Sequence, residues 1–118
     1  MASKTVLVID DVELYRDMLK DHLGSMGVQV LEADTATAGL ELLRRDTHVD
    51  LVLLDGTPGG DRRKAFLDIQ AVRPGIAVVV MSGEPWENLE QYFKGLPVGY
   101  LGKPFSVGRV LEILEGVP

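Results

Sequence analysis

The stretch "LVLLDGTPGGD", residues 51–61, decides the fold that this sequence predicts. Its four apolar residues suit a strand covered on both faces, and a carboxylate, Asp55, stands at the end of that strand. One Pro and three Gly follow, so the chain loosens directly after the acid. A lone Asp55 could simply begin an Asx-turn into Gly56, so its meaning depends on which side chains the fold brings beside it.

The composition indicates a single soluble globular domain. The chain has 118 residues, of which 46% are hydrophobic and 25% charged. No apolar run approaches the roughly 20 residues of a membrane span, and the start "MASKTVLVID" lacks the features of a signal peptide. We therefore expect a cytoplasmic protein that does not insert into a membrane.

The number of cysteines and the net charge exclude some kinds of site and partner. The chain has no cysteine, which excludes disulfides and thiolate metal sites and agrees with a cytoplasmic location. Its net charge of -6 argues against a protein that binds nucleic acid directly.

Apolar runs of strand length alternate along the chain with stretches of helical period. The expected strands are 5–10, 28–33, 51–55, 76–82 and 99–102. The expected helices are 13–26, 35–45, 61–72, 85–94 and 106–115. Three strand candidates are continuously apolar, which is typical of parallel strands with both faces covered. Five β-α units in a chain of this size predict a doubly wound α/β sandwich with right-handed crossovers.

Some details of the helices also follow from the sequence. Helix 13–26 is expected to bury one broad face made of Leu14, Met18, Leu19, Leu23 and Met26. Asp34 or Thr35 is expected to cap the second helix and Ser106 the last one. Trp86, Tyr92 and Phe93 lie at helical spacing, which usually indicates core. The basic run at 62–64 is expected to be a solvated face, and His22 and His48 are expected to be surface residues.

Polar residues stand at the ends of four expected strands. Asp10 and Asp11 follow the first strand, Asp55 ends the third, Ser82 ends the fourth and Lys103 follows the fifth. In doubly wound folds the working site lies at the carboxyl ends of the strands. We therefore expect these five side chains to meet at one edge of the sheet.

This set of residues suits phosphoryl transfer. Three carboxylates at one edge repel each other unless a cation lies among them, and Mg²⁺ takes oxygen ligands of this kind. A carboxylate can itself act as nucleophile and become an acyl phosphate. On this interpretation Asp55 attacks, Asp10 and Asp11 hold Mg²⁺, and Lys103 and Ser82 contact phosphoryl oxygens. Alone, Asp10 and Asp11 could instead cap the first helix.

Four segments together resemble the receiver domain of two-component response regulators. They are "VLVIDD" at 6–11, "LVLLD" at 51–55, "VVVMSG" at 78–83 and "GYLGKPF" at 99–105. The resemblance covers the whole chain as one domain, 1–118, with the motifs in the family's order. It implies a flavodoxin-like fold, in which a five-stranded parallel sheet of order 2-1-3-4-5 is flanked by five helices.

The resemblance also implies roles for individual residues. Position by position, they are Asp55 as phosphoacceptor and metal ligand, Asp10 and Asp11 as the metal-binding pair, Ser82 as switch hydroxyl, Tyr100 as switch aromatic, Lys103 as the family's lysine, Pro104 as a cis-proline, and the Thr57 backbone carbonyl as a further metal ligand. The implied donor is a phosphohistidine on a sensor histidine kinase or a histidine phosphotransfer protein. Phosphorylation is then expected to change how the surface of the fourth helix, fifth strand and fifth helix binds a downstream protein. No enzyme activity is expected beyond phosphotransfer and dephosphorylation at Asp55 itself.

The loop after the acceptor departs from the family pattern. Counted from Asp55, both Pro58 and Asp61 come one residue early, so the loop 57–60 looks one residue shorter and richer in Gly. The segment from Ser82 to Phe105 resembles receivers of hybrid sensor kinases. No output domain follows the last expected helix, so we expect a stand-alone receiver or a piece of a longer regulator or hybrid kinase.

Two other functions remain open at this point. A receiver-like module could dock partners without being phosphorylated, which the short loop favours. A small Mg²⁺-dependent phosphatase with an aspartyl nucleophile is less well supported. Such enzymes commonly carry a second acid two residues after the nucleophile, where this chain has Thr57.

Overall fold

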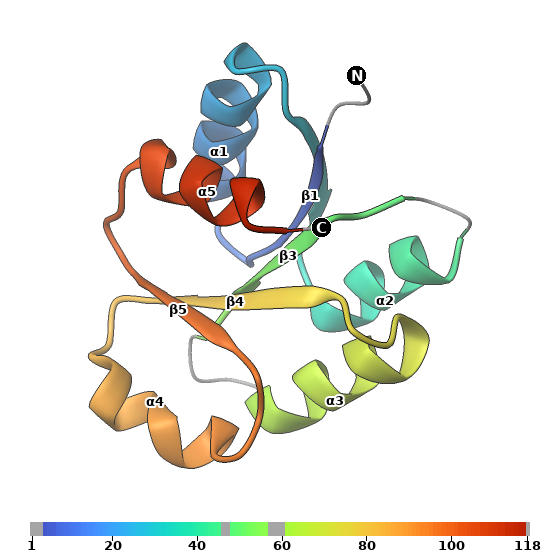
Figure 1. Ribbon diagram of the computed structural model, residues 1–118, viewed down its shortest axis with the longest axis vertical. Helices are drawn as coiled ribbons and strands as arrows, with labels where there is room; N and C mark the ends of the chain where they lie inside the picture. Colours follow the sequence, from blue (N-terminus) through green and yellow to red (C-terminus); the bar gives the residue numbers. More distant parts are fainter. Residues whose placement is uncertain (1–3, 46–47, 57–60, 118) are drawn as a thin grey trace.

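Five parallel strands form one sheet in the order β2-β1-β3-β4-β5 in the computed structural model, which describes residues 4–45, 48–56 and 61–117 (Figure 1). The strands are β1 (Thr5–Ile9), β2 (Gln29–Ala33), β3 (Leu51–Asp55), β4 (Ala77–Ser82) and β5 (Gly99–Gly102). Each neighbouring pair is parallel. The predicted doubly wound fold and its strand order are confirmed.

One helix follows each strand, and the helices cover both faces of the sheet (Figure 1). They are α1 (Glu13–Ser25), α2 (Ala36–Arg44), α3 (Arg62–Val72), α4 (Trp86–Phe93) and α5 (Val107–Glu115). Helices α1 and α5 lie on one face, and α2, α3 and α4 lie on the other. Among the described residues, no helix is both long and apolar enough to cross a membrane.

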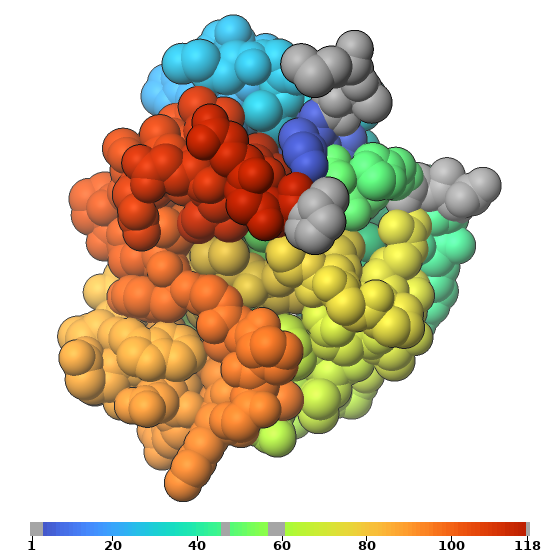
Figure 2. All heavy atoms as spheres, viewed as in Figure 1, coloured from blue at the N-terminus to red at the C-terminus, as the bar shows by residue number. Residues whose placement is uncertain are grey.

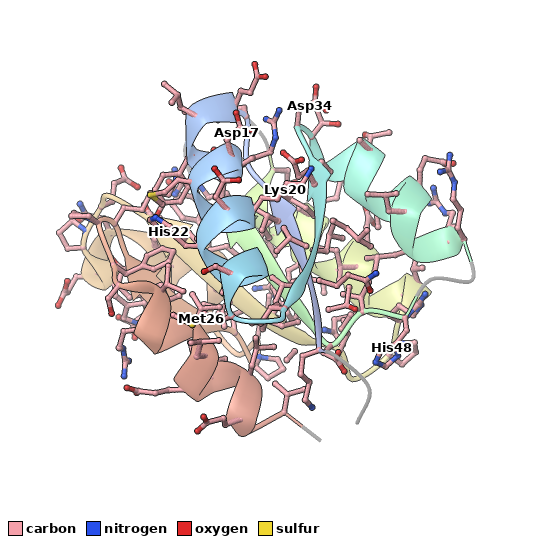
Figure 3. All side chains as sticks on the ribbon, turned by 90° about the horizontal axis from the view of Figure 1, so that it is seen from above. Asp17, Lys20, His22, Met26, Asp34 and His48 are labelled. Carbon is pink, nitrogen blue, oxygen red and sulfur yellow. The ribbon has the colours of Figure 1, made fainter. Side chains whose placement is uncertain are left out.

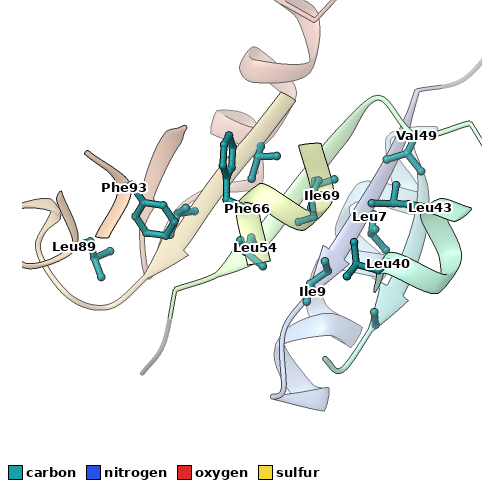
Figure 4. Packing of buried hydrophobic residues seen from close by; sticks show 14 residues of the cluster. Leu7, Ile9, Leu40, Leu43, Val49, Leu54, Phe66, Ile69, Leu89 and Phe93 are labelled. Carbon is teal, nitrogen blue, oxygen red and sulfur yellow. The ribbon is translucent and has the colours of Figure 1, made fainter. Parts of the chain in front are cut away.

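Alternate residues of the central strands feed two separate cores. In β1, Leu7 and Ile9 pack with α2 and α3, whereas Val6 and Val8 pack with α1 and α5. This division follows from the two-residue period of a strand, and it explains why the strand sequences are continuously apolar. Figure 4 shows the first core, in which Leu40 and Leu43 of α2 lie over β1.

Helix α1 buries a narrower face than its sequence predicted. Leu19 and Leu23 are fully buried, but Leu14 is 80% exposed and Met26 is 63% exposed. The prediction that Leu14 is buried is wrong because Leu14 precedes Leu19 by five residues, whereas side chains on one helix face are three or four residues apart. The prediction that Met26 is buried is wrong because α1 ends at Ser25 and Met26 is its C-cap residue.

The helix caps follow the sequence only in part. The Thr35 side chain caps α2 by accepting a hydrogen bond from the Ala38 amide at 3.1 Å. Ser106 occupies the N-cap position of α5, but its side chain makes no capping hydrogen bond. Asp61 caps α3 through the amide of Lys64 at 2.9 Å.

The two ends of the sheet are chemically different. Figure 3 places Asp34, which follows β2, near Asp17 at one end of the molecule, with Met26 and His48 at the other. At the amino ends of the strands, buried Asp50 accepts the Thr5 amide at 2.8 Å and contacts His48 Nε2 at 2.8 Å.

Candidate functional site

Three carboxylates meet at the carboxyl ends of β1 and β3. Asp10 and Asp11 follow the last residue of β1, and Asp55 is the last residue of β3. These strands are hydrogen-bonded neighbours, so the three acids are brought to one place although 44 positions separate Asp11 from Asp55. One carboxylate oxygen from each lies within 4.8 Å of the others. We call this group the acidic edge.

Asp10 is the most buried acid of the acidic edge. It is 1% exposed, and its Oδ1 accepts the amide of Val12 at 2.9 Å. Helix α1 has Val12 as its N-cap residue, with no side-chain capping bond. Asp10 therefore fixes the turn into α1 with one oxygen, while its Oδ2 points to the site.

Lys103 supplies the positive charge of the site. Its Nζ donates to Asp10 Oδ2 at 2.8 Å and lies 3.6 Å from Asp55 Oδ1. The backbone amide of Lys103 donates to the Ser82 carbonyl at 2.7 Å, which anchors the residue beyond the end of β5. The Lys103–Pro104 peptide bond is cis, as the resemblance implies.

The donor set of the acidic edge fits a hard divalent cation. All three ligands are carboxylate oxygens, the type that Mg²⁺ prefers. Asp11 is exposed and Asp55 partly so, so solvent reaches the site from the side of these two acids. The Thr57 backbone carbonyl, the further metal ligand that the resemblance implies, lies outside the described residues.

Ser82 and Tyr100 are joined through one residue between them, Glu84. The buried Ser82 hydroxyl accepts the amide of Glu84 at 3.0 Å. The Tyr100 hydroxyl donates to the carbonyl of the same Glu84. Tyr100 is half-buried and packs against Trp86, with ring centroids 5.5 Å apart. The loop after β4 is thus held by both predicted switch residues.

Gly56 allows the chain to turn closely past β4 directly after Asp55. Its amide donates to the Met81 carbonyl at 2.8 Å. A Cβ at this position would lie 2.7 Å from Cγ1 of Val80. Space, rather than an unusual backbone angle, therefore requires glycine here.

Comparison with known proteins decides the family. The protein-family model of the response regulator receiver domain matches residues 6–115 of this chain. The chain belongs to this family. It is therefore a receiver domain of the kind used in two-component systems.

Curated relatives of this receiver occur both as small proteins and as parts of larger ones. The chain is 30% identical to the chemotaxis protein CheY of Thermotoga maritima over 118 residues, covering 97% of each chain. It is 31% identical over 113 residues to the autoinducer 1 sensor kinase/phosphatase LuxN of Vibrio campbellii, covering 95% of this chain but 13% of LuxN. It is 32% identical to the transcriptional regulatory protein KdpE of Escherichia coli, covering 89% of this chain and 47% of KdpE.

Solved structures confirm the fold. The chemotaxis protein CheY4 of Vibrio cholerae aligns with a TM-score of 0.80 at 24% identity, covering 99% of this chain and 100% of that one. The receiver domain of the hybrid histidine kinase CckA aligns with a TM-score of 0.75 at 23% identity, covering 95% and 96%.

Arg62 of this receiver is not the solvated residue that its sequence predicted. Its side chain is 9% exposed, and Nη2 lies 3.5 Å from Oε2 of Glu84. Its guanidinium also lies over the ring of Tyr92, 4.6 Å from the centroid. The basic side chain is largely shielded from solvent because α4 and the loop before it supply an aromatic face and an acid, neither of which is near in sequence.

Tyr15 is a site residue that the sequence analysis did not single out. Its ring lies 4.3 Å from Lys103 Nζ, and it packs edge-on against Phe105. Burial raises the pKa of its phenol to about 12, and the negative charges of Asp10 and Asp55 add to the shift. No pattern within α1 marks Tyr15, because the residues that its ring contacts, Lys103 and Phe105, both follow β5.

Proposed function

We propose that this receiver accepts a phosphoryl group on Asp55 from a phosphohistidine and so acts as a signalling switch. The observation that carries the proposal is the acidic edge with the Lys103 ammonium in contact with two of its three carboxylates, those of Asp10 and Asp55. The expected partners are a sensor histidine kinase or a histidine phosphotransfer protein, because receiver domains interact with these proteins. We also propose that the protein is located in the cytoplasm.

The proposed reaction uses few protein groups. An Asp55 carboxylate oxygen attacks phosphorus, the new O–P bond forms, and the N–P bond of the phosphohistidine breaks. The electron pair of that bond returns to the imidazole nitrogen, which can then take a proton from water. Transfer of this kind needs positioning and charge neutralisation more than covalent machinery.

The residues of the acidic edge divide these tasks. Asp10, Asp11 and Asp55 would hold Mg²⁺, which when bound neutralises phosphoryl charge. Lys103 supplies a further positive charge for a phosphoryl oxygen. Asp55 is the group that is modified, so we propose that the domain catalyses phosphotransfer to its own Asp55 and dephosphorylation of that residue, and no other reaction.

The proposed output follows from the bonds around Glu84. A phosphoryl group on Asp55 adds hydrogen-bond acceptors near Ser82. If Ser82 turns to donate to them, it no longer holds the Glu84 amide. The Tyr100 contact to the same residue then loses its fixed partner, and the α4-β5-α5 surface changes its affinity for a downstream protein.

The test is formation of a covalent adduct. Purified protein is incubated with Mg²⁺ and acetyl phosphate, and the intact mass is measured over time. We expect one phosphoryl adduct in the wild type, none without Mg²⁺ and none in Asp55→Asn. Asp61→Asn, a matched change at the cap of α3, keeps the adduct. A folded wild type that forms no adduct would leave the phosphorylation-independent docking module as the better explanation.

A further inference from the structure

Lys103 has two chemically different kinds of partner. Its ammonium contacts carboxylate oxygens of Asp10 at 2.8 Å and Asp55 at 3.6 Å. It also lies 4.3 Å from the centroid of the Tyr15 ring. A cation within about 6 Å of an aromatic face is attracted by the ring's electron density, and the attraction grows when water is excluded. Lys103 is mostly buried, so this condition is met.

The Tyr15 ring is itself held in place. Tyr15 lies in the first turns of α1, where its backbone amide donates to the Val12 carbonyl at 3.1 Å. Phe105, two residues after Lys103, packs against it with ring centroids 6.0 Å apart at 80°. The ring thus contacts both Lys103 and Phe105.

The phenol group does not explain why Tyr15 lies here. Its buried oxygen has no hydrogen-bond partner among the residues that the structure describes. Burying such a group without a partner costs free energy. The contribution of Tyr15 to the site therefore comes from its ring rather than from its hydroxyl.

The two kinds of partner respond differently to a bound divalent cation. Hard cations take carboxylate oxygens as ligands, so a cation at the acidic edge competes with Lys103 for Asp10 and Asp55. An aromatic face is no ligand for such an ion. Among the described contacts of the ammonium, the Tyr15 ring is the partner that remains when the oxygens are taken.

We propose that Tyr15 is a positioning residue, whose ring face keeps the Lys103 ammonium at the acidic edge while the carboxylates are engaged with a cation. This inference rests on the proposed function, because it gives Tyr15 a part in phosphoryl transfer to Asp55. Removal of the ring then lets Lys103 swing toward solvent, whereas removal of the hydroxyl alone leaves it in place.

The first experiment observes Lys103 directly and needs no phosphorylation. Protons over an aromatic face resonate upfield, so the Lys103 ε-methylene shifts report the ring contact. They are assigned by comparison with Lys103→Met and measured with and without Mg²⁺. We expect upfield shifts in the wild type, in Tyr15→Phe and in Leu14→Ala, a control at an exposed position of the same helix. Tyr15→Leu and Tyr15→Met should lose them, and measuring both protects the test against misfolding of one.

The second experiment measures the rate of adduct formation with acetyl phosphate as Mg²⁺ is varied. Tyr15→Leu and Tyr15→Met should lower the rate by about threefold to tenfold at saturating Mg²⁺, the range expected for one partly buried cation–π contact. Tyr15→Phe should recover nearly the full rate. The Mg²⁺ concentration at half-maximal rate should stay unchanged, because Tyr15 is not a metal ligand.

Two results would overturn the inference. One is an unchanged Lys103 shift or an unchanged rate in both ring-less variants. The other is a Tyr15→Phe protein as slow as those variants, since the hydroxyl would then be the active part. If the wild type forms no adduct but its Lys103 shift depends on the ring, the proposed function fails while the positioning of Lys103 by Tyr15 stands.

Discussion

Asp10 carries a negative charge in a place where water hardly reaches it. Its side chain is fully buried, and its two oxygens are satisfied by the Val12 amide and by Lys103 Nζ. A buried charge is tolerated when it is paired and hydrogen-bonded, and removal of one partner exposes the full cost of burying the other. Lys103 therefore contributes to the stability of the fold as well as to the site.

Substitution of Lys103 tests this dependence. In Mg²⁺-free buffer at neutral pH, Lys103→Met should lower the free energy of unfolding by about 1–3 kcal/mol, because Asp10 loses its counter-charge. Adding Asp10→Asn should recover most of the loss, as measured by urea unfolding of both single variants and the double variant. Lys64→Met serves as a matched control, since Lys64 pairs with Asp68 on the exposed face of α3. Equal losses from the two lysine changes would contradict the prediction.

The raised pKa of Tyr15 makes a prediction at alkaline pH. The phenol pKa is about 12 in the folded protein, against a usual value of 10.0. Below pH 10 both folded and unfolded chains keep the proton, and the stabilising contribution is fully present. Between pH 10 and 12 the unfolded chain gives up its proton first, so the free energy of unfolding falls as pH rises.

Two measurements check this expectation. Phenolate absorbance of the wild type minus that of Tyr15→Phe should show one transition centred near pH 12. Denaturation at several pH values should show a steeper alkaline loss of stability in the wild type than in Tyr15→Phe. A difference transition near pH 10 would show that the phenol is not shielded.

At the scale of elements, the loop between β4 and α4 connects the acidic edge to the surface of α4 and β5. Its residue Glu84 is contacted by Ser82 through the amide, by Tyr100 through the carbonyl and by Arg62 through the carboxylate. Arg62 begins α3, and it reaches α4 as well through the ring of Tyr92. A movement of this loop therefore has to break or carry along contacts with three other elements.

The coupling between α3 and α4 can be measured with a double-mutant cycle. Arg62→Ala and Tyr92→Leu should be non-additive in unfolding free energy by about 0.5–1 kcal/mol, because both remove the same cation–π contact. Arg63→Ala with Tyr92→Leu is the control. Arg63 follows Arg62 but donates to the Lys94 carbonyl instead. Additivity of the Arg62 pair would show that the contact contributes nothing.

The helices and strands could be predicted to the extent that their signals lie within the segment itself. All ten helices and strands of the described residues were expected from apolar runs and helical spacing, because these signals are local. The exposed Leu14 shows that a broad apolar face can be assigned too generously when the true face is set by Leu19 and Leu23.

The acidic edge was predicted for a different reason. Parallel strands place their carboxyl ends together, so Asp10, Asp55 and Lys103 could be brought into one site by topology alone. Arg62 and Tyr15 could not be assigned in this way. Their roles arise from contacts with rings and charges on other elements, which a periodic pattern within one helix does not reveal.

At the scale of the whole molecule, the two ends of the sheet carry different groups. The acidic edge lies at the carboxyl ends, whereas the amino ends hold the Asp50 contacts with Thr5 and His48. Lys103 already offers positive charge to Asp10 and Asp55, and a cation bound at the acidic edge would offset more of the negative charge there. Such binding favours the folded chain, since the unfolded chain does not assemble the three carboxylates.

Magnesium should accordingly stabilise the whole domain. At Mg²⁺ tenfold above its dissociation constant, the free energy of unfolding should rise by about 1.4 kcal/mol, with a matching rise in melting temperature. Asp11→Asn should remove most of the rise, and Asp11 is exposed, so its loss leaves no buried group unpaired. Asp17→Asn, on the next turn of α1, is the control and should keep the rise. An equal rise in Asp11→Asn would place the ion elsewhere.

The contact between Lys4 and Val117 has a consequence for how such a domain can be built into proteins of different length. The Lys4 ammonium donates to the Val117 carbonyl at 2.9 Å, and Figure 2 shows the start of β1 against the end of α5. A polypeptide can therefore enter and leave the fold at one spot, at the amino ends of the strands. Segments joined there would lie away from the acidic edge and leave it open to solvent. The same geometry suits a free-standing receiver and one inserted between two other domains.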